Sequence, residues 1–300
     1  MKNKLLLLAL CTYGYLMQAQ ADRDYSAYYD QIVIIEQANA REDFDEALRL
    51  YMLAFVKFDR VFARDAYNAC QIAALKNHKD FNTFFMYCAK SGIEKSKLTR
   101  NKLIARQYVT DSIKLNYLFV KGYKIYSERI DTTLRSEFKR RYELEQAHKD
   151  SADYKKICKD NFTRIKTLAR QDRFPGENLI GPDPNLENGY VTSTLLDYPY
   201  AYVQLQPFLT QAVKAGKIQP LSALYLYGFN QTRTGKLYDA SVPADTANFK
   251  AIYNLPFGLS SENSAEVNSQ RKAARIFSTD VEASLELMAE KNKIDYLFGY

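Results

Sequence analysis

The sequence predicts a mostly α-helical protein, in which helical hairpins are followed by long helices and by a smaller helical C-terminal domain with a long Pro/Gly-rich loop. Apolar residues recur at the spacing of one helix face, for example at Phe44, Leu48 and Tyr51. Residues 98–173 contain a single glycine and no proline. Six prolines and glycines then fall within residues 174–190, and such punctuation indicates a loop.

The first 21 residues have the three parts of a cleavable secretory signal. Lys2 and Lys4 precede an apolar stretch from Leu5 to Met17, and Ala19-Gln20-Ala21 offers a small-x-small cleavage site. The apolar stretch is shorter than the roughly 20 residues of a transmembrane helix. We therefore expect residues 1–21 to be removed and the mature chain to be exported, either to the periplasm or out of the cell.

A lipid anchor on Cys11 is the alternative to a free mature chain. Lipidation needs a small residue directly before the cysteine, whereas Leu10 is large. We therefore favour a periplasmic or secreted protein over a lipid-anchored one. No later segment is long and apolar enough to span a bilayer, so we expect no transmembrane segment after cleavage.

Residues 22–97 are predicted to form helical hairpins. Asp43 is a natural N-cap for a first helix, and a second helix is expected from about Arg64 to Lys76. Asp80-Phe81-Asn82 then repeats Asp43-Phe44-Asp45 at an offset of 37 residues, close to the period of about 34 of tetratricopeptide repeats. One such echo is not an array, but it makes the segment tetratricopeptide-like.

Residues 98–173 are predicted to be one or two long helices that break near Asp131-Thr132. An apolar face is expected within them, formed by Ile113, Tyr117, Val120 and Tyr123 and widened by Leu115, Leu118, Phe119 and Tyr126. Residues 174–300 are predicted to be the long loop followed by a helical C-terminal domain. Its helices are expected near residues 205–215 and 280–291.

The formal net charge of +7 falls to +5 when the signal is removed, because the signal contains two lysines and no acid. This excess is too small to predict nucleic-acid binding. The basic run from Lys139 to Arg173 has acids such as Glu137 and Asp160 among its cations. We therefore favour a solvated helix face with local ion pairs, and an anionic partner is the alternative.

Cleavage leaves three cysteines, Cys70, Cys88 and Cys158. Cys70 and Cys88 are equally far from the turn expected at Lys79, so an antiparallel hairpin would place them at the same height. A disulfide between them is compatible with an oxidising compartment. The alternative is that both are small buried apolar residues.

No motif for a common enzyme class is present. The only histidines, His78 and His148, are expected on the surface, and neither accompanies a nucleophile motif. Cys-x-x-Cys pairs, His-Glu-x-x-His and glycine-rich phosphate loops are also lacking. We therefore name no catalytic residue, metal ligand or cofactor, and lean against an enzyme.

Tyrosines gather after the long loop, and they are the candidate binding residues. Exposed aromatic side chains could stack on a sugar or a peptide, whereas packing between helices is the alternative role. The cluster consists of Tyr190, Tyr198, Tyr200, Tyr202, Tyr225 and Tyr227.

Several stretches carry a resemblance to a known kind of protein. They are Asp65-Ala66-Tyr67-Asn68-Ala69-Cys70, the segment from Asp80-Phe81 to Ser91-Gly92, Asp160-Asn161, Arg173-Phe174-Pro175-Gly176-Glu177-Asn178-Leu179-Ile180-Gly181, Leu209, Ala212-Val213, Gly216-Lys217-Ile218 and Pro220. In this order they resemble exported Gram-negative bacterial proteins that join a tetratricopeptide-like N-terminus to a helical C-terminal domain of unknown function. This chain departs from that pattern, since such proteins tend to carry histidine where Tyr198, Tyr200 and Tyr202 lie. A Tyr-Gly-Thr-like turn is likewise replaced here by residues 235–239.

The sequence therefore predicts an exported helical module for protein binding or scaffolding, with a protein or peptide partner in the cell envelope. The alternative is a glycan-binding protein or hydrolase with a site near the 174–190 loop and the tyrosine cluster.

Overall fold

The computed structural model describes residues 24–58, 60–184, 186, 189–198, 200–226 and 264–298. Across these residues the chain is mostly helical and contains no strand, which confirms the predicted fold class. The helices are α2 (Ser26–Ala40), α3 (Phe44–Lys57), α4 (Ala63–Leu75), α5 (Phe81–Lys90), α6 (Lys95–Arg100), α7 (Lys102–Thr110), α8 (Ser112–Ser127), α9 (Thr132–Ala147), α10 (Tyr154–Arg170), α11 (Glu177–Ile180), α12 (Gly189–Leu196), α13 (Ala201–Lys214), α16 (Ser264–Ala273) and α17 (Thr279–Asn292).

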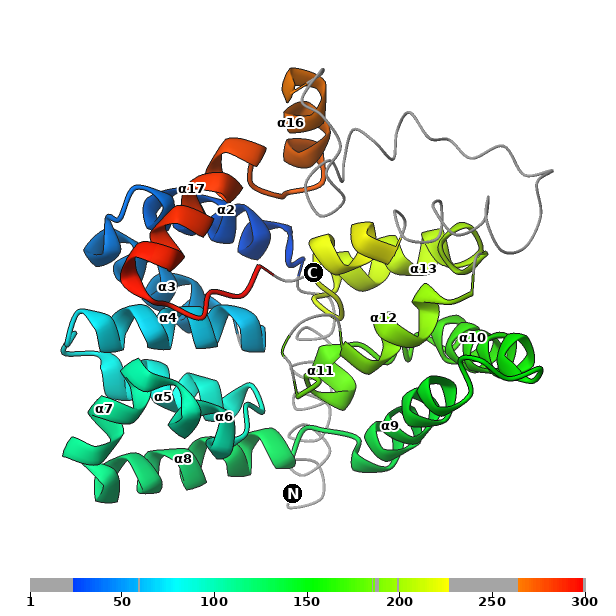
Figure 1. Ribbon diagram of the computed structural model, residues 1–300, viewed down its shortest axis with the longest axis horizontal. Coiled ribbons are helices and arrows are strands. Elements are labelled where there is room, and N and C mark those ends of the chain that lie inside the picture. Colours follow the sequence, from blue (N-terminus) through cyan, green and yellow to red (C-terminus); the bar gives the residue numbers. More distant parts are fainter. Residues whose placement is uncertain are drawn as a thin grey trace, which may run out of the picture.

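The helices form two lobes, which lie side by side in Figure 1. The first lobe contains α2 to α8 and α17, and the second contains α9 to α13. Each lobe has its own apolar core, and the core of the first lobe is the larger. The chain passes from the first lobe to the second between α8 and α9 (Figure 1).

The hairpins of the first lobe begin and end close to the predicted residues. The side chain of Asp43 accepts a hydrogen bond from the backbone N–H of Glu46 and so caps α3, as predicted. Helix α4 packs against α3, α5 and α7 and is buried along almost its whole length. Its many alanines allow this close approach from several sides. The tetratricopeptide-like register of the hairpins stays a prediction.

The expectation of one or two long helices over residues 98–173 is wrong, because the chain forms five helices there. Asn101 ends α6 and caps α7, accepting bonds of 3.1 Å from the N–H groups of Leu103 and Ile104. Asp111 separates α7 from α8 with a non-helical backbone. Short polar side chains favour such breaks because they bond to nearby backbone groups. The break expected at Asp131 is confirmed, since its side chain caps α9.

The C-terminal segment packs against the first lobe, whereas the sequence pattern assigned it to one domain together with the rest of residues 174–300. Helix α17 packs against α2, and residues 293–298 continue onto α2 and α4. Asn68 exchanges two hydrogen bonds with the backbone of Leu297, at 2.8 and 3.0 Å. Asn39 donates to the hydroxyl of Tyr296 at 2.9 Å. The core of the first lobe is therefore completed by the far end of the chain.

A buried polar cluster lies beneath this returning segment. The hydroxyl of Tyr296 donates to the carboxyl of Glu36, and burial raises the pKa of Glu36 to about 7. Arg64 forms a buried ion pair with Asp65 at 2.6 Å, and the hydroxyl of Tyr28 donates to Asp65 at 2.6 Å. These bonds satisfy charges that would otherwise be costly to bury.

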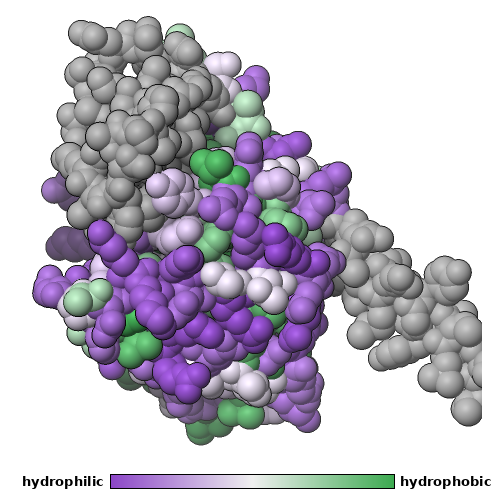
Figure 2. Space-filling view, turned by 90° about the vertical axis from the view of Figure 1, so that its right-hand side faces the viewer, coloured by the Kyte–Doolittle hydropathy of each residue, from purple (hydrophilic) through white to green (hydrophobic). Residues whose placement is uncertain are grey.

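The surface of the second lobe that lies to the right in Figure 1 is mostly hydrophilic (Figure 2). Several cations of the second lobe are locally paired: Arg164 and Arg141 both bond to Glu137, at 2.9 and 2.8 Å. These bonds lower the pKa of Glu137 to about 2. Lys156 pairs with Asp160 at 3.0 Å. The basic run thus has the ion pairs expected of a solvated helix face.

Over the described ranges, none of the helices combines the length and the apolar character required to cross a bilayer.

Candidate functional site

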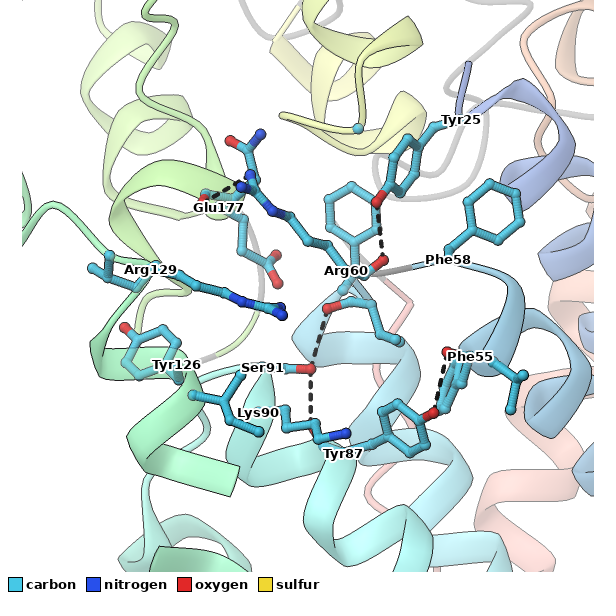
Figure 3. Close-up of a pocket in the computed structure, with 17 residues that line it drawn as sticks. Tyr25, Phe55, Phe58, Arg60, Tyr87, Lys90, Ser91, Tyr126, Arg129 and Glu177 are labelled. Carbon is cyan, nitrogen blue, oxygen red and sulfur yellow. Dashed lines mark hydrogen bonds between the residues drawn. The ribbon is translucent and has the colours of Figure 1, made fainter. Parts of the chain in front are cut away.

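A cavity of about 270 Å³ lies where the two lobes meet (Figure 3). Its first-lobe wall is formed by the start of α2, the connection between α3 and α4, and the C-terminal ends of α5 and α8. Its second-lobe wall is formed by α11 and by Gly216, just after α13. We call the space enclosed by these residues the inter-lobe cavity.

Aromatic residues form the apolar part of the inter-lobe cavity. Phe58 and Phe62 come from the connection between α3 and α4, which is extended at both positions. The hydroxyl of Tyr25 donates to the carbonyl of Arg60 at 3.3 Å, and its backbone N–H donates to Lys214 at 2.8 Å. The Tyr25 ring is therefore held between the two lobes.

Glycine permits the close approach of the lobes beside this ring. Gly216 has φ +66°, and a Cβ at this position would lie 2.6 Å from the ring of Tyr25. Only glycine accepts both the left-handed backbone and the contact without strain. Gly216 thus fixes how closely α13 approaches the first lobe.

Glu177 is the acid of the cavity. Its backbone N–H donates to Lys217 at 2.9 Å, and its carboxyl accepts a hydrogen bond of 2.6 Å from the N–H of Ala63, the first residue of α4. Burial raises the pKa of Glu177 to about 8. The carboxyl is therefore mostly protonated and neutral near pH 7.

Three cationic side chains line the same cavity: Arg60, Lys90 and Arg129. Figure 3 shows the side chains of Arg129 and Glu177 pointing into one space. The pKa of Lys90 is lowered by burial and by repulsion from Arg129 and Lys121. Glu177 is the only acid among the described lining residues, and Asp59 lies outside the described residues. The described lining is therefore electropositive.

One acceptor in the lining has no hydrogen-bond partner in the described structure. The side-chain oxygen of Asn178 is buried and unbonded, whereas the backbone carbonyl of this residue accepts from Arg60 at 3.3 Å. Leaving a buried acceptor unpaired costs about 1–3 kcal/mol.

None of the described tyrosines of the predicted cluster lines this cavity. Tyr190 is buried in the core of the second lobe, 6.0 Å from the ring of Tyr142. Tyr198 stacks on Phe162 at 4.3 Å, while Tyr200, Tyr202 and Tyr225 are half-buried. Tyr227 lies outside the described residues. Tyr190 and Tyr198 thus make packing contacts, and the binding role of the cluster stays a prediction.

Cys70, Cys88 and Cys158 are buried and free in the described structure. A hydrogen bond joins the thiols of Cys70 and Cys88, so the hairpin brings the two together, but no disulfide links them in the structure. The thiol of Cys88 also donates to the carbonyl of Ala66 at 3.2 Å.

The sequence did not single out the residues of the inter-lobe cavity. Arg60, Lys90 and Arg129 lie on three separate segments, and no spacing along the chain joins them. Glu177 falls in the 174–190 loop that was named as a site, so that loop was the available signal. The residues carried by the family resemblance include Glu177 and Gly216.

The described residues contain no group of three or more His, Cys, Asp or Glu side chains that could hold a metal ion. Comparison of the chain with protein-family models, with curated proteins and with solved structures finds no match. The resemblance to exported Gram-negative proteins stays a prediction, and the geometry of the cavity carries the functional argument.

Proposed function

We propose that this chain is a binding protein whose inter-lobe cavity takes up the carboxylate-bearing end of a peptide or protein partner. The observation that carries the proposal is that Arg60, Lys90 and Arg129 line one cavity together with a half-buried Glu177 that is mostly neutral near pH 7. Cations beside a neutral acid retain their attraction for an anion, and bonds between a cation and a carboxylate are among the stronger hydrogen bonds.

The size and lining of the cavity support an end of a chain as the ligand. Its volume of about 270 Å³ lies just below the roughly 300–1,000 Å³ of pockets that hold whole drug-sized molecules. Phe58 and Phe62 offer an apolar wall for a terminal side chain. If the chain is exported, as its first residues predict, the partner belongs to the cell envelope.

A hydrolase is the second candidate, and the raised pKa of Glu177 favours it. A neutral carboxyl in a pocket is suited to act as a general acid. Glycoside hydrolysis generally requires a second carboxylate within about 10 Å that faces the substrate. Asp65 and Asp183 are close enough to Glu177 to help raise its pKa, but neither lines the cavity. Binding is therefore the better supported function.

Matched peptides test the proposal. Short peptides that end in phenylalanine, with a free carboxylate or a terminal amide, would be titrated by calorimetry. We expect the amide to bind about tenfold more weakly or worse, because it forfeits charge-assisted bonds. Phenylacetate, titrated in parallel, distinguishes a peptide from any small carboxylic acid.

Variants locate the binding. Arg129→Gln should weaken binding of the free carboxylate, whereas Arg106→Gln, an exposed change on α7, should leave it unchanged. Equal binding of acid and amide, or binding unaffected by Arg129→Gln, would refute the proposal. Turnover of a glycan or ester that is lost in Glu177→Gln would support the hydrolase instead.

A further inference from the structure

A row of exposed apolar side chains runs along the outer face of α8. Ile113, Tyr117 and Val120 are 87%, 66% and 67% exposed. Their spacing of four and three residues places them in one line on the helix. The sequence predicted an apolar face here, but the structure buries Leu115 and Tyr126 and turns these three residues outward.

The row lies on the last helix of the first lobe before the chain crosses to the second (Figure 1). The opposite face of α8 is held tightly: a Cβ at Gly122 would lie 2.8 Å from the carbonyl of Met86 on α5. Terminal helices of stacked hairpins usually present a polar outer face. An apolar row on a firmly seated terminal helix is a surface suited to a further helix.

The charge around the row identifies the kind of helix. Residues 95–130 contain nine lysines and arginines and only two acids, so their net charge of +7 equals that of the whole chain. Lys124 continues the row by one turn, and Lys114 and Lys121 border it along one side. The two acids, Asp111 and Glu128, lie 4.0 and 3.8 Å from Lys114 and Lys124 and partly offset the charge of these two lysines. The net charge of +7 already counts both acids.

We propose that this face of α8 docks an acidic amphipathic helix of another protein. The apolar row would pack against the apolar positions of that helix, and its glutamates or aspartates would face the lysines. A second copy of this chain is disfavoured, because it would bring two strongly positive faces together. A membrane surface is disfavoured because membrane-bound helices present a broad apolar face and not a single row. The proposal is independent of the inter-lobe cavity.

Two designed peptides test this surface. Both would be labelled helices of about 18 residues with leucine at the same heptad positions, flanked by glutamate in one and by lysine in the other. Fluorescence anisotropy with the whole protein should show binding of the glutamate peptide, about tenfold or more tighter than the lysine peptide, and weaker at higher salt.

Variants make the test specific. Ile113→Ser with Val120→Ser should abolish binding of the glutamate peptide, and Lys114→Glu with Lys121→Glu should shift the preference to the lysine peptide. Leu287→Ser, at an exposed apolar position of α17, is the matched control and should change nothing. Circular dichroism verifies that each variant is folded.

Three outcomes would overturn the proposal: no preference between the peptides, binding that survives the row variants, or binding of neither peptide. Two further measurements would show that a membrane or a second copy of the chain, and not an acidic helix, occupies this face. Row-dependent binding to vesicles containing phosphatidylserine, without peptide binding, would assign the face to a membrane. Row-dependent self-association in sedimentation would assign it to a second copy.

Discussion

The carboxyl of Glu177, in the second lobe, accepts a hydrogen bond of 2.6 Å from the backbone N–H of Ala63, in the first. Ala63 is the first residue of α4, and the preceding residue, Phe62, provides no side-chain cap. Glu177 therefore supplies from a distance the acceptor that a local capping residue usually provides. The same bond positions a neutral acid within the inter-lobe cavity.

The stability of the protein should fall as Glu177 ionises. Its pKa is raised from 4.5 to about 8 in the folded chain, so the stabilisation is complete below pH 4.5 and is lost as pH rises through 8. The free energy of unfolding should fall by about 1.4 kcal/mol per pH unit within this window. Urea unfolding at several pH values should show that Glu177→Gln removes this contribution. Equal slopes in the two proteins would contradict it.

Glu36 should contribute in a narrower window. Its pKa is raised from 4.5 to about 7 by burial, so its stabilisation is present below pH 4.5 and lost as pH rises through 7. Glu36→Gln should reduce the pH dependence below 7 and leave the part between 7 and 8, which belongs to Glu177. Thermal unfolding of the single and double variants separates the two. An identical profile in Glu36→Gln and the parent would refute this assignment.

Gly216→Ala should destabilise the protein and loosen the contact between the lobes. A Cβ there would lie 2.6 Å from the ring of Tyr25, and the backbone has φ +66°. Gly189→Ala is the matched control, since Gly189 has φ +73° but no atom within 4 Å of its Cβ position. Both should lose about 1–2 kcal/mol for the backbone, and Gly216→Ala should lose more. Equal losses of the free energy of unfolding in the two variants, measured by chemical denaturation, would show that the ring of Tyr25 moves aside without cost and would contradict the prediction.

Asn68→Ala should release the returning C-terminal segment. It removes both hydrogen bonds to Leu297 and leaves that backbone unpaired in the core, at a cost of about 2–4 kcal/mol. Hydrogen exchange should rise in residues 293–298 before the rest of the first lobe. Asn82→Ala, at a half-buried position of α5, serves as the control. Unchanged protection of the C-terminal segment would contradict the prediction.

Cys70, Cys88 and Cys158 should resist thiol reagents until the protein unfolds. All three are buried, and the pKa of Cys88 is raised well above its usual value by burial and by the neighbouring thiol of Cys70. A buried thiol that is not ionised is a poor nucleophile. Labelling in urea should count three free thiols in these positions. A count of only one free thiol would reveal a disulfide between Cys70 and Cys88.

Local features of the fold could be predicted because their causes are local. The cap at Asp43, the start of α5 at Phe81 and the break at Asp131 each depend on a few neighbouring residues. The breaks at Asn101 and Asp111 were missed, because the apolar spacing continues across both positions. Side chains of short polar residues can bond to the backbone in place of helical hydrogen bonds. They break a helix only where tertiary packing stabilises the broken form.

The site could not be predicted because its causes are distant. Glu177 looks like an ordinary loop acid until the loop places it against Ala63, 114 positions earlier in the chain. The α8 face shows the same limit. Apolar spacing identifies the residues of a helix that could be buried, but only the packed structure shows that Leu115 is covered and Ile113 is not.

The return of residues 293–298 has a consequence for synthesis. Asn39 and Tyr296, which bond across the core of the first lobe, are 257 positions apart. Domains generally fold as they leave the ribosome, starting from the N-terminus. Here the lobe that emerges first stays incomplete until the last segment follows, with buried polar groups such as Glu36 and Asn68 still lacking their partners. Folding of the first lobe is therefore delayed until residues 293–298 have been synthesised. During this time the unfolded chain stays accessible to chaperones and to the translocation machinery that its first residues predict.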